Sequence, residues 1–250
     1  MKQNKKIFFI LIGVLILVIG VFGVLYLKKQ NDGNAISQEQ LFENIITNNT
    51  SEGEVNRTSV VADLKKENPD VIGWLEIPNT EINYPVLQGT DNEYYMTHDY
   101  KKEYTKDGSL FLDVEYDWSI PSSNLLIYGH NNNNGKMFNG LMDYKKEEFY
   151  KEHPTIKFTT EQEDSEYEII AVFLSRVYYK NEENVFRYYY FINAETEAEF
   201  NDYVENSLKA SLYDTGKTAE YGEQLLTLST CSYHTQDGRL AVVAKKISNN

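Results

Sequence analysis

The chain has 250 residues, of which 41% are hydrophobic and 14% aromatic, so it can form a packed core and is not expected to be disordered. Its formal net charge is −14, and because positions 1–29 contain five lysines and no acidic residue, residues 30–250 carry a charge of −19. A domain this acidic is not expected to bind nucleic acid, because that needs clustered Lys and Arg. It is also expected to be repelled by an anionic membrane surface. We interpret the charge first as a source of solubility.

An uncharged apolar run of 21 residues, Ile7 to Leu27, has the length that a helix needs to cross a bilayer. Lysines flank the run on both sides, but a short basic N-terminus normally stays in the cytoplasm. We therefore expect residues 1–6 inside, a transmembrane signal anchor at 7–27, a linker at 28–37 and an extracytoplasmic domain at 38–250. A cleaved signal peptide is the alternative, although the run exceeds the usual apolar region of about 7–15 residues and no Ala-x-Ala-like site follows it.

Two amphipathic helices are expected at the start of this domain, over Gln38 to Asn49 and over Ser59 to Asn68, and Pro69 ends the second. From Val71 the hydrophobic period changes to that of strands, and the 20 Tyr and 12 Phe suit half-buried strand faces. The predicted strands are Gly73–Pro78, Ile82–Leu87, Ser109–Asp113, Asn124–Tyr128, Thr155–Thr160, Tyr167–Tyr179, Phe186–Phe191, Glu223–Cys231 and Arg239–Ile247. A further helix is expected over Glu195 to Leu212, between the strands that begin at 186 and 223. Many short strands with few helices predict a mainly β domain, either a barrel or a sandwich.

The only cysteine, Cys231, ends one predicted strand on the same face as Thr227 and Ser229. A lone cysteine can be a buried hydrophobe, an intermolecular link or a reactive thiol. A short loop with the turn signal Asp237-Gly238 joins it to the strand that begins at Arg239. Because the last residue of one hairpin strand lies beside the first residue of the next, we expect Cys231 and Arg239 to be neighbours.

This pair has chemical meaning, because a guanidinium beside a thiol favours the thiolate. It can also stabilise the oxyanion that forms when sulfur attacks a carbonyl. An arginine at the start of a strand is equally typical of an ordinary surface position. The pair alone therefore leaves both interpretations open, and a nucleophile also needs a base.

The chain has four histidines from which this base could come. His98 and His153 lie in polar segments and are expected at the surface, and His234 lies in the polar loop after Cys231 and is expected to be exposed. His130 ends a strongly apolar strand, next to Gly129, which permits an unusual backbone angle or a close approach. His130 is the best candidate, but 101 residues separate it from Cys231, so spacing alone supports only a hypothesis.

Three motifs in order resemble the signature of sortases, and most closely that of class B sortases, which are surface-protein transpeptidases of Gram-positive bacteria. They are Tyr128-Gly-His130-Asn, Thr227-Leu-Ser-Thr-Cys231, and Arg239 eight residues later. The resemblance extends from about Asn68 to Lys246 and includes Asn68–Leu75, Ile82–Gln88, Asp91–Met96, Gly108–Asp113 and Met137–Leu141. Two N-terminal helices and an inserted helix are also class B features, whereas class C sortases usually carry a lid and a C-terminal span, and class A proteins lack the long insertion.

The resemblance implies an eight-stranded β-barrel with two N-terminal helices and a helix inserted between the sixth and seventh strands. It implies that Cys231 attacks the carbonyl of a Thr in the C-terminal sorting motif of a surface protein and holds the acyl group as a thioester. His130 then moves the protons, and Arg239 stabilises the oxyanion. The acyl group passes to an amine of a cell-wall precursor or a pilin. No cofactor is implied, and few histidines with no second cysteine offer no zinc site.

By matched position the resemblance further implies substrate contacts and one wall of the peptide groove. The contacts are Asn92, Met96, Tyr128, Ser229 and Thr230, and the wall is the segment 186–212. Tyr128 is equally consistent with a core aromatic, and Ser232 stands where class B enzymes often carry an acidic residue, which leaves the peptide preference open. Two other functions remain: a membrane-anchored cysteine peptidase that hydrolyses its acyl-enzyme, and a catalytically silent surface-binding module.

Overall fold

The computed structural model describes residues 44–45, 47–51, 54–120 and 122–247. The chain divides into two compact units, Met1–Asn48 and Asn49–Asn250, and every element named below belongs to the second. The predicted membrane anchor and linker lie outside the described residues, as does most of the predicted helix at Gln38 to Asn49, of which residues 44–45 and 47–48 are helical. Among the residues described, no helix combines the length and the apolar character needed to cross a bilayer.

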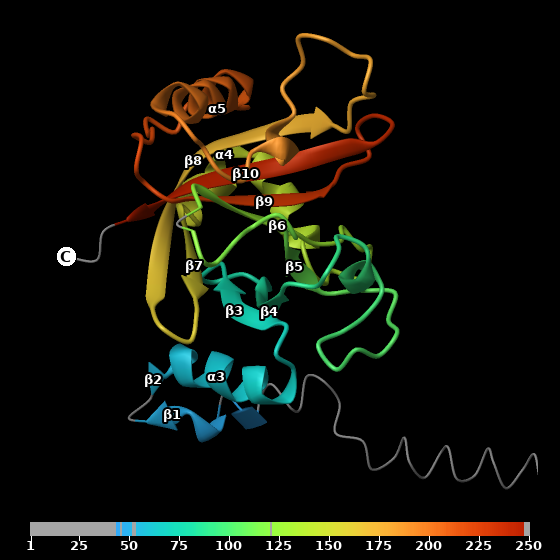
Figure 1. Cartoon of the computed structure of the whole chain (residues 1–250), viewed down its shortest axis with the longest axis vertical. Helices are drawn as coiled ribbons and strands as arrows, with labels where there is room; N and C mark the ends of the chain where they lie inside the picture. Colours follow the sequence, from blue (N-terminus) through green and yellow to red (C-terminus); the bar gives the residue numbers. More distant parts are fainter. Residues whose placement is uncertain (1–43, 46, 52–53, 121, 248–250) are drawn as a thin grey trace, which may run out of the picture. The chain divides into compact units, whose positions relative to one another are not determined.

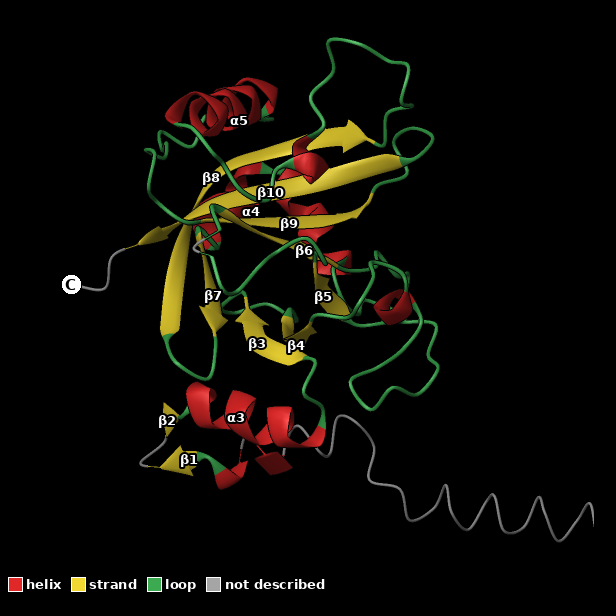
Figure 2. Cartoon of the chain, in the orientation of Figure 1, coloured by secondary structure: helices red, strands yellow, loops and turns green. Residues whose placement is uncertain are grey.

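Eight strands close into a barrel at the centre of the second unit (Figure 1, Figure 2). They are β3 (Val71–Glu76), β4 (Asn83–Leu87), β5 (Leu110–Leu112), β6 (Asn124–Tyr128), β7 (Thr155–Thr159), β8 (Asp164–Arg176), β9 (Leu225–Cys231) and β10 (Gly238–Ile247). Around the barrel their order is β10-β8-β7-β3-β4-β5-β6-β9. Most neighbours are antiparallel, but β4 pairs with β5, and β6 with β9, in parallel. The predicted mainly β fold is confirmed, and the barrel rather than the sandwich is the correct alternative.

The core consists of fully buried apolar side chains that the barrel strands contribute. Leu75, Val86, Leu126, Phe173 and Val242 come from five different strands and are each 0% exposed. Burying one such side chain is worth about 1.5–3 kcal/mol relative to leaving it in water. The packed barrel is therefore a rigid support for the residues at its strand ends.

Shorter elements surround the barrel. They are the two-stranded sheet of β1 (Thr50–Ser51) and β2 (Glu54–Val55), the helices α3 (Arg57–Glu67), α4 (Glu147–Glu152) and α5 (Glu197–Ala210), and the 3-10 turns η1 (Tyr94–Met96), η2 (Asn139–Lys145) and η3 (Tyr188–Tyr190). Helix α5 follows β8 and precedes β9, the sixth and seventh strands of the barrel in chain order, as predicted. It packs against β8 (Figure 2).

Local sequence signals account for the limits of both long helices. The side chain of Asn56 accepts a hydrogen bond from the backbone N–H of Ser59 and caps α3, and that helix ends just before Pro69, which the sequence predicted. Thr196 caps α5 in the same way, by accepting from the N–H of Glu199. The apolar face of α5 buries Phe200 and its neighbours. Helical periodicity therefore predicted both helices to within two residues at either end.

The predicted strand at Phe186–Phe191 is wrong, because this segment contains η3 and pairs with no strand. Its aromatic residues, which favour strands, pack in different directions instead. Tyr188 is fully buried, the hydroxyl of Tyr189 accepts from the N–H of Tyr178, and Tyr190 is 66% exposed. Aromatic content indicated the wrong element here because tertiary packing decided the backbone conformation.

Candidate active site

The register of β6, β9 and β10 brings three predicted site residues together. β6 and β9 run parallel with Tyr128 opposite Ser229, and the same offset of 101 residues separates His130 from Cys231. His130 follows the end of β6 by two residues and Cys231 is the last residue of β9, so both lie at the same end of this parallel pair. In the antiparallel hairpin of β9 and β10, Cys231 pairs directly with Arg239, which confirms that they are neighbours.

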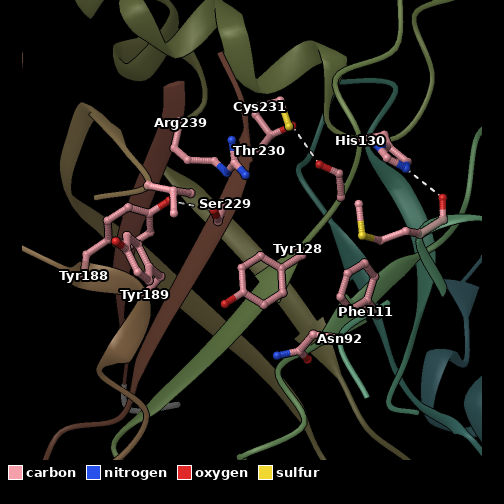
Figure 3. A pocket seen from close by; sticks show the side chains of 13 residues that line it. Asn92, Phe111, Tyr128, His130, Tyr188, Tyr189, Ser229, Thr230, Cys231 and Arg239 are labelled. Atoms are coloured by element: carbon pink, nitrogen blue, oxygen red, sulfur yellow. Dashed lines mark hydrogen bonds between the residues drawn. The ribbon is translucent and has the colours of Figure 1, made fainter. Parts of the chain in front are cut away.

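These strand ends form the rim of a pocket of about 260 Å³. It is lined by all eight residues that the sequence singled out, His130, Cys231, Arg239, Asn92, Met96, Tyr128, Ser229 and Thr230, and also by Phe111, Gly129, Val177, Tyr188 and Tyr189. Figure 3 shows Arg239, Cys231 and His130 along one side of this pocket, with Tyr128 and Asn92 further from the rim. Of the predicted groove wall at 186–212, Tyr188 and Tyr189 line the pocket, whereas no residue of α5 does.

The backbone of Cys231 is tied to the end of β6. Its carbonyl accepts a hydrogen bond from Asn131 Nδ2 at 3.0 Å, and Asn131 Oδ1 in turn accepts from Asn139 Nδ2 at 2.7 Å. The hydroxyl of Thr230 donates to the carbonyl of Gly129 at 2.7 Å. The thiol itself is free and half-buried. These side-chain bonds join the two strand ends beyond the last backbone pair of β6 and β9.

The glycine before His130 is required by packing. A Cβ on Gly129 would lie 2.7 Å from Cδ2 of Phe138, which is fully buried. A larger residue would therefore displace either this core aromatic or the strand end. The close approach that the sequence suggested for Gly129 is what the structure shows.

The imidazole of His130 is oriented by a backbone carbonyl. Its Nε2 lies 2.7 Å from the carbonyl oxygen of Met96, so Nε2 carries a proton, since a carbonyl can only accept. In the neutral ring Nδ1 is then the nitrogen with a free lone pair. Met96 was predicted as a substrate contact, and its main chain has this second effect, for which no sequence pattern exists.

The guanidinium of Arg239 is held by the loop that precedes it. Nη1 donates to the carbonyls of Gly238 at 2.9 Å and of Asp237 at 3.3 Å. No carboxylate of the described residues forms an ion pair with Arg239. Its charge is therefore available to an anionic group that forms near Cys231.

The lower part of the pocket carries polar groups whose hydrogen bonds are already made. Ser229, which is 2% exposed, shares a hydrogen bond of 2.7 Å with the hydroxyl of Tyr188. Tyr128 donates to Asp113 at 2.9 Å, and Asn92 donates to the same carboxylate. Burial and then the charge of Asp113 raise the pKa of Tyr128, so its hydroxyl is not a base at neutral pH.

The other three histidines do not line the pocket. His98 stacks on Tyr94 with ring centroids 4.1 Å apart, and Nδ1 of His153 bonds with the carbonyl of Pro78, so both are half-buried rather than fully at the surface. His234 is exposed, as predicted, and its Nδ1 lies 3.0 Å from the hydroxyl of Ser232. His130 is the only histidine among the lining residues.

Comparison with known proteins identifies the family. The model of the sortase domain matches residues 75–247. Sortase B of Listeria monocytogenes is 31% identical over 98% of this chain and 97% of its own length, and sortase B of Staphylococcus aureus is 28% identical over 99% and 98%.

Solved structures agree with these relatives. The crystal structure of Staphylococcus aureus sortase B matches with a TM-score of 0.73 at 26% identity, covering 85% of this chain and 97% of that one. The structure of Listeria monocytogenes sortase B matches with a TM-score of 0.64 at 34% identity, covering 74% and 98%. Since the family model matches more than half of the chain and a relative at 31% identity spans nearly all of it, the chain belongs to the sortase family, as a cysteine transpeptidase of class B.

Proposed function

We propose that this transpeptidase cleaves the C-terminal sorting motif of a surface protein after its Thr and transfers that protein to an amine of a cell-wall precursor or a pilin. The observation that carries the proposal is that His130, Cys231 and Arg239 line one pocket at the neighbouring ends of β6, β9 and β10, with Cys231 paired to Arg239. A nucleophile, a proton carrier and a fixed cation at one pocket rim are what acyl transfer through a thioester needs.

Acylation uses all three residues. In the reacting form the proton of the thiol resides on His130, and Sγ of Cys231 attacks the carbonyl carbon of the Thr residue. The negative charge that develops on the carbonyl oxygen is stabilised by the guanidinium of Arg239. His130 then gives its proton to the leaving nitrogen, the peptide C–N bond breaks, and the acyl group remains on Cys231 as a thioester.

Deacylation reverses the proton path. The amine of the acceptor attacks the thioester carbon, His130 takes the proton that the nitrogen loses, and the C–S bond breaks as the new amide forms. The hydrogen bond from Nε2 to the Met96 carbonyl supports this role, because it leaves Nδ1 of His130 to accept and return a proton.

The peptide itself is proposed to lie in the pocket below the three residues. Asn92, Met96, Tyr128, Ser229 and Thr230 are the proposed contacts, and all five line it. Phe111, Val177 and Tyr189 add apolar surface to the same pocket, which suits an extended peptide with few charges.

We also propose that the enzyme is a single-pass membrane protein of the Gram-positive cell surface, with residues 1–6 inside, the anchor at 7–27 and the catalytic domain outside. The 21-residue uncharged run and the basic N-terminus support this arrangement. Protease digestion of intact cells, followed by mass spectrometry of the peptides released into the medium and of those that stay with the cells, would test it. Fragments from residues 38–250 in the medium support the proposal, and full protection of that region contradicts it.

The transfer reaction is tested with the full-length protein in detergent and a peptide that carries a sorting signal. The expected result is a thioester on Cys231 by mass spectrometry and, with triglycine or diaminopimelate present, a product joined to that amine. Replacing Cys231 by Ala should abolish both. Hydrolysis that no amine alters would instead indicate a cysteine peptidase, and an enzyme that forms no thioester would indicate a binding module.

A further inference from the structure

Asp113 is a buried carboxylate immediately after β5 that faces the pocket residues without lining the pocket itself. Its residue is only 4% exposed, and among the described residues no Lys, Arg or His forms an ion pair with it. Burying an unpaired charge is unfavourable unless hydrogen bonds replace its water. The hydrogen-bond donors around Asp113 therefore indicate which groups this carboxylate orients.

Three donors converge on the two oxygens. Oδ1 accepts from the backbone N–H of Glu115 at 2.9 Å, which closes a local turn. Oδ2 accepts from Nδ2 of Asn92 at 3.0 Å and from the hydroxyl of Tyr128 at 2.9 Å. Asn92 and Tyr128 are 36 residues apart in the chain, and both line the pocket. One carboxylate thus connects two pocket residues from different elements.

These bonds decide which way the amide of Asn92 faces. Its Oδ1 accepts from the backbone N–H of Val114 at 2.9 Å while its Nδ2 donates to Asp113. The flipped amide would set oxygen against the carboxylate and N–H against N–H, so only one orientation is stable. The second N–H of the Asn92 amide remains for a ligand, so Asn92 can act as a donor to a bound peptide.

The same carboxylate sets the polarity of Tyr128. The hydroxyl of Tyr128 has a single hydrogen, which it donates in the hydrogen bond to Asp113. Towards the pocket its oxygen can therefore act only as an acceptor. We propose that Asp113 is a positioning residue of the peptide pocket. It presents Asn92 as a hydrogen-bond donor and Tyr128 as an acceptor to the substrate. This inference deepens the proposed function and rests on it.

The chain offers a matched control in Asp117, four residues later. Its Oδ1 accepts from the N–H of Ser119 at 2.8 Å, which is the same local turn bond that Asp113 makes to Glu115. Asp117 is exposed and does not line the pocket. Replacing Asp117 by Ala removes a turn carboxylate from this loop and leaves Asn92 and Tyr128 in place.

Peptide binding is measured in the Cys231→Ala background, where no chemistry occurs, with a fluorescent peptide that carries a sorting signal. Asp113→Ala should raise Kd about 10-fold, as expected for losing the orientation of two polar contacts. Asp113→Asn keeps the volume but has one acceptor oxygen fewer, and it should give a smaller increase. Asp117→Ala should leave Kd unchanged. With Cys231 restored, Asp113→Asn should raise KM while kcat stays within about twofold.

A double-mutant cycle separates positioning from general damage to the fold. When Asn92→Ala and Tyr128→Phe are already present, Asp113→Asn should have no further effect on Kd, because nothing remains for it to orient. The inference is overturned if Asp113→Asn lowers the melting temperature but leaves Kd unchanged, or if its effect on Kd adds fully to that of the other two substitutions. If the wild-type enzyme binds the peptide but does not transfer it, the proposed function is contradicted. The effect of Asp113 on Kd can still be interpreted, because the binding assay does not depend on transfer.

Discussion

At the scale of single residues, the pocket rim combines one free thiol with groups held by backbone carbonyls. Met96 orients His130, and the carbonyls of Asp237 and Gly238 hold Arg239. Backbone acceptors do not depend on side-chain rotamers, so both groups are pre-organised before a peptide arrives. In the proposed mechanism the guanidinium is the fixed cation that stabilises the developing oxyanion.

Removing that cation should slow the chemical step far more than it weakens binding. Arg239→Ala is expected to lower kcat about 100- to 1000-fold, the usual effect of losing one oxyanion donor. Arg239→Lys retains a charge but not the planar fork, so it should recover only part of the rate. Single-turnover measurement of thioester formation would check this. Wild-type rates in Arg239→Ala would show that another group holds the oxyanion.

At the scale of elements, the site depends on a parallel pair of strands that would otherwise end at Tyr128 and Ser229. Asn131 extends the pairing by one further bond, from its amide to the carbonyl of Cys231. Asn139 holds that amide in place. Together with the bond from Thr230 to the carbonyl of Gly129, these contacts join the segment that carries His130 to the strand that carries Cys231.

Asn131→Ala should therefore lower kcat about 10-fold with little change in KM, because a loss of alignment affects the reacting groups rather than the peptide pocket. Steady-state kinetics would measure the two parameters. Asn134→Ala is the matched control, since Asn134 lies in the same loop but donates to Asp107 at 2.8 Å. Equal losses in both variants would mean that the loop as a whole, and not the bond to Cys231, is responsible.

The order and length of the elements could mostly be predicted from the sequence. The barrel strands, α3 and α5 follow the periods of 2 and 3.6 residues, and the hairpin that joins Cys231 to Arg239 has a local turn signal. The strand predicted at Phe186–Phe191 failed because its aromatic residues are distributed among different partners. These partners are determined by packing between segments far apart in the chain, and a local hydrophobic period cannot predict such packing.

At the scale of the whole molecule, the loop that carries Asn92 and Met96 is anchored to the start of β3. Asp70 accepts from the hydroxyl of Tyr95 at 2.6 Å and forms an ion pair with Lys102 at 2.8 Å. Burial by itself would raise the pKa of Asp70, but the hydrogen bonds from Lys102 and Tyr95 outweigh it and lower that pKa below its usual 3.8. The ionised carboxylate therefore stabilises the folded state.

This anchor should make stability depend on pH in the acid range. Because the pKa of Asp70 is lower in the folded than in the unfolded chain, its contribution is fully present above the unfolded value and is lost as pH falls through the folded value. The difference in unfolding free energy between the wild type and Asp70→Asn should thus shrink below about pH 4. Urea unfolding at pH 7 and pH 3 would measure it, and a constant or growing difference would refute the assignment.

By itself the sequence determined the mainly β fold class and the pairing of Cys231 with Arg239, because strand periodicity and a hairpin are local properties of the chain. The motif resemblance added the proposed roles of Cys231, His130 and Arg239. Only the tertiary structure brought His130 and Cys231 to the same end of a parallel strand pair and into one pocket, since parallel strands pair through a long crossover and leave no local signal for their register. It also brought Asn131 and Asp113 to their hydrogen-bond partners. Each acts through hydrogen bonds to residues distant in the chain, which form only when the barrel closes.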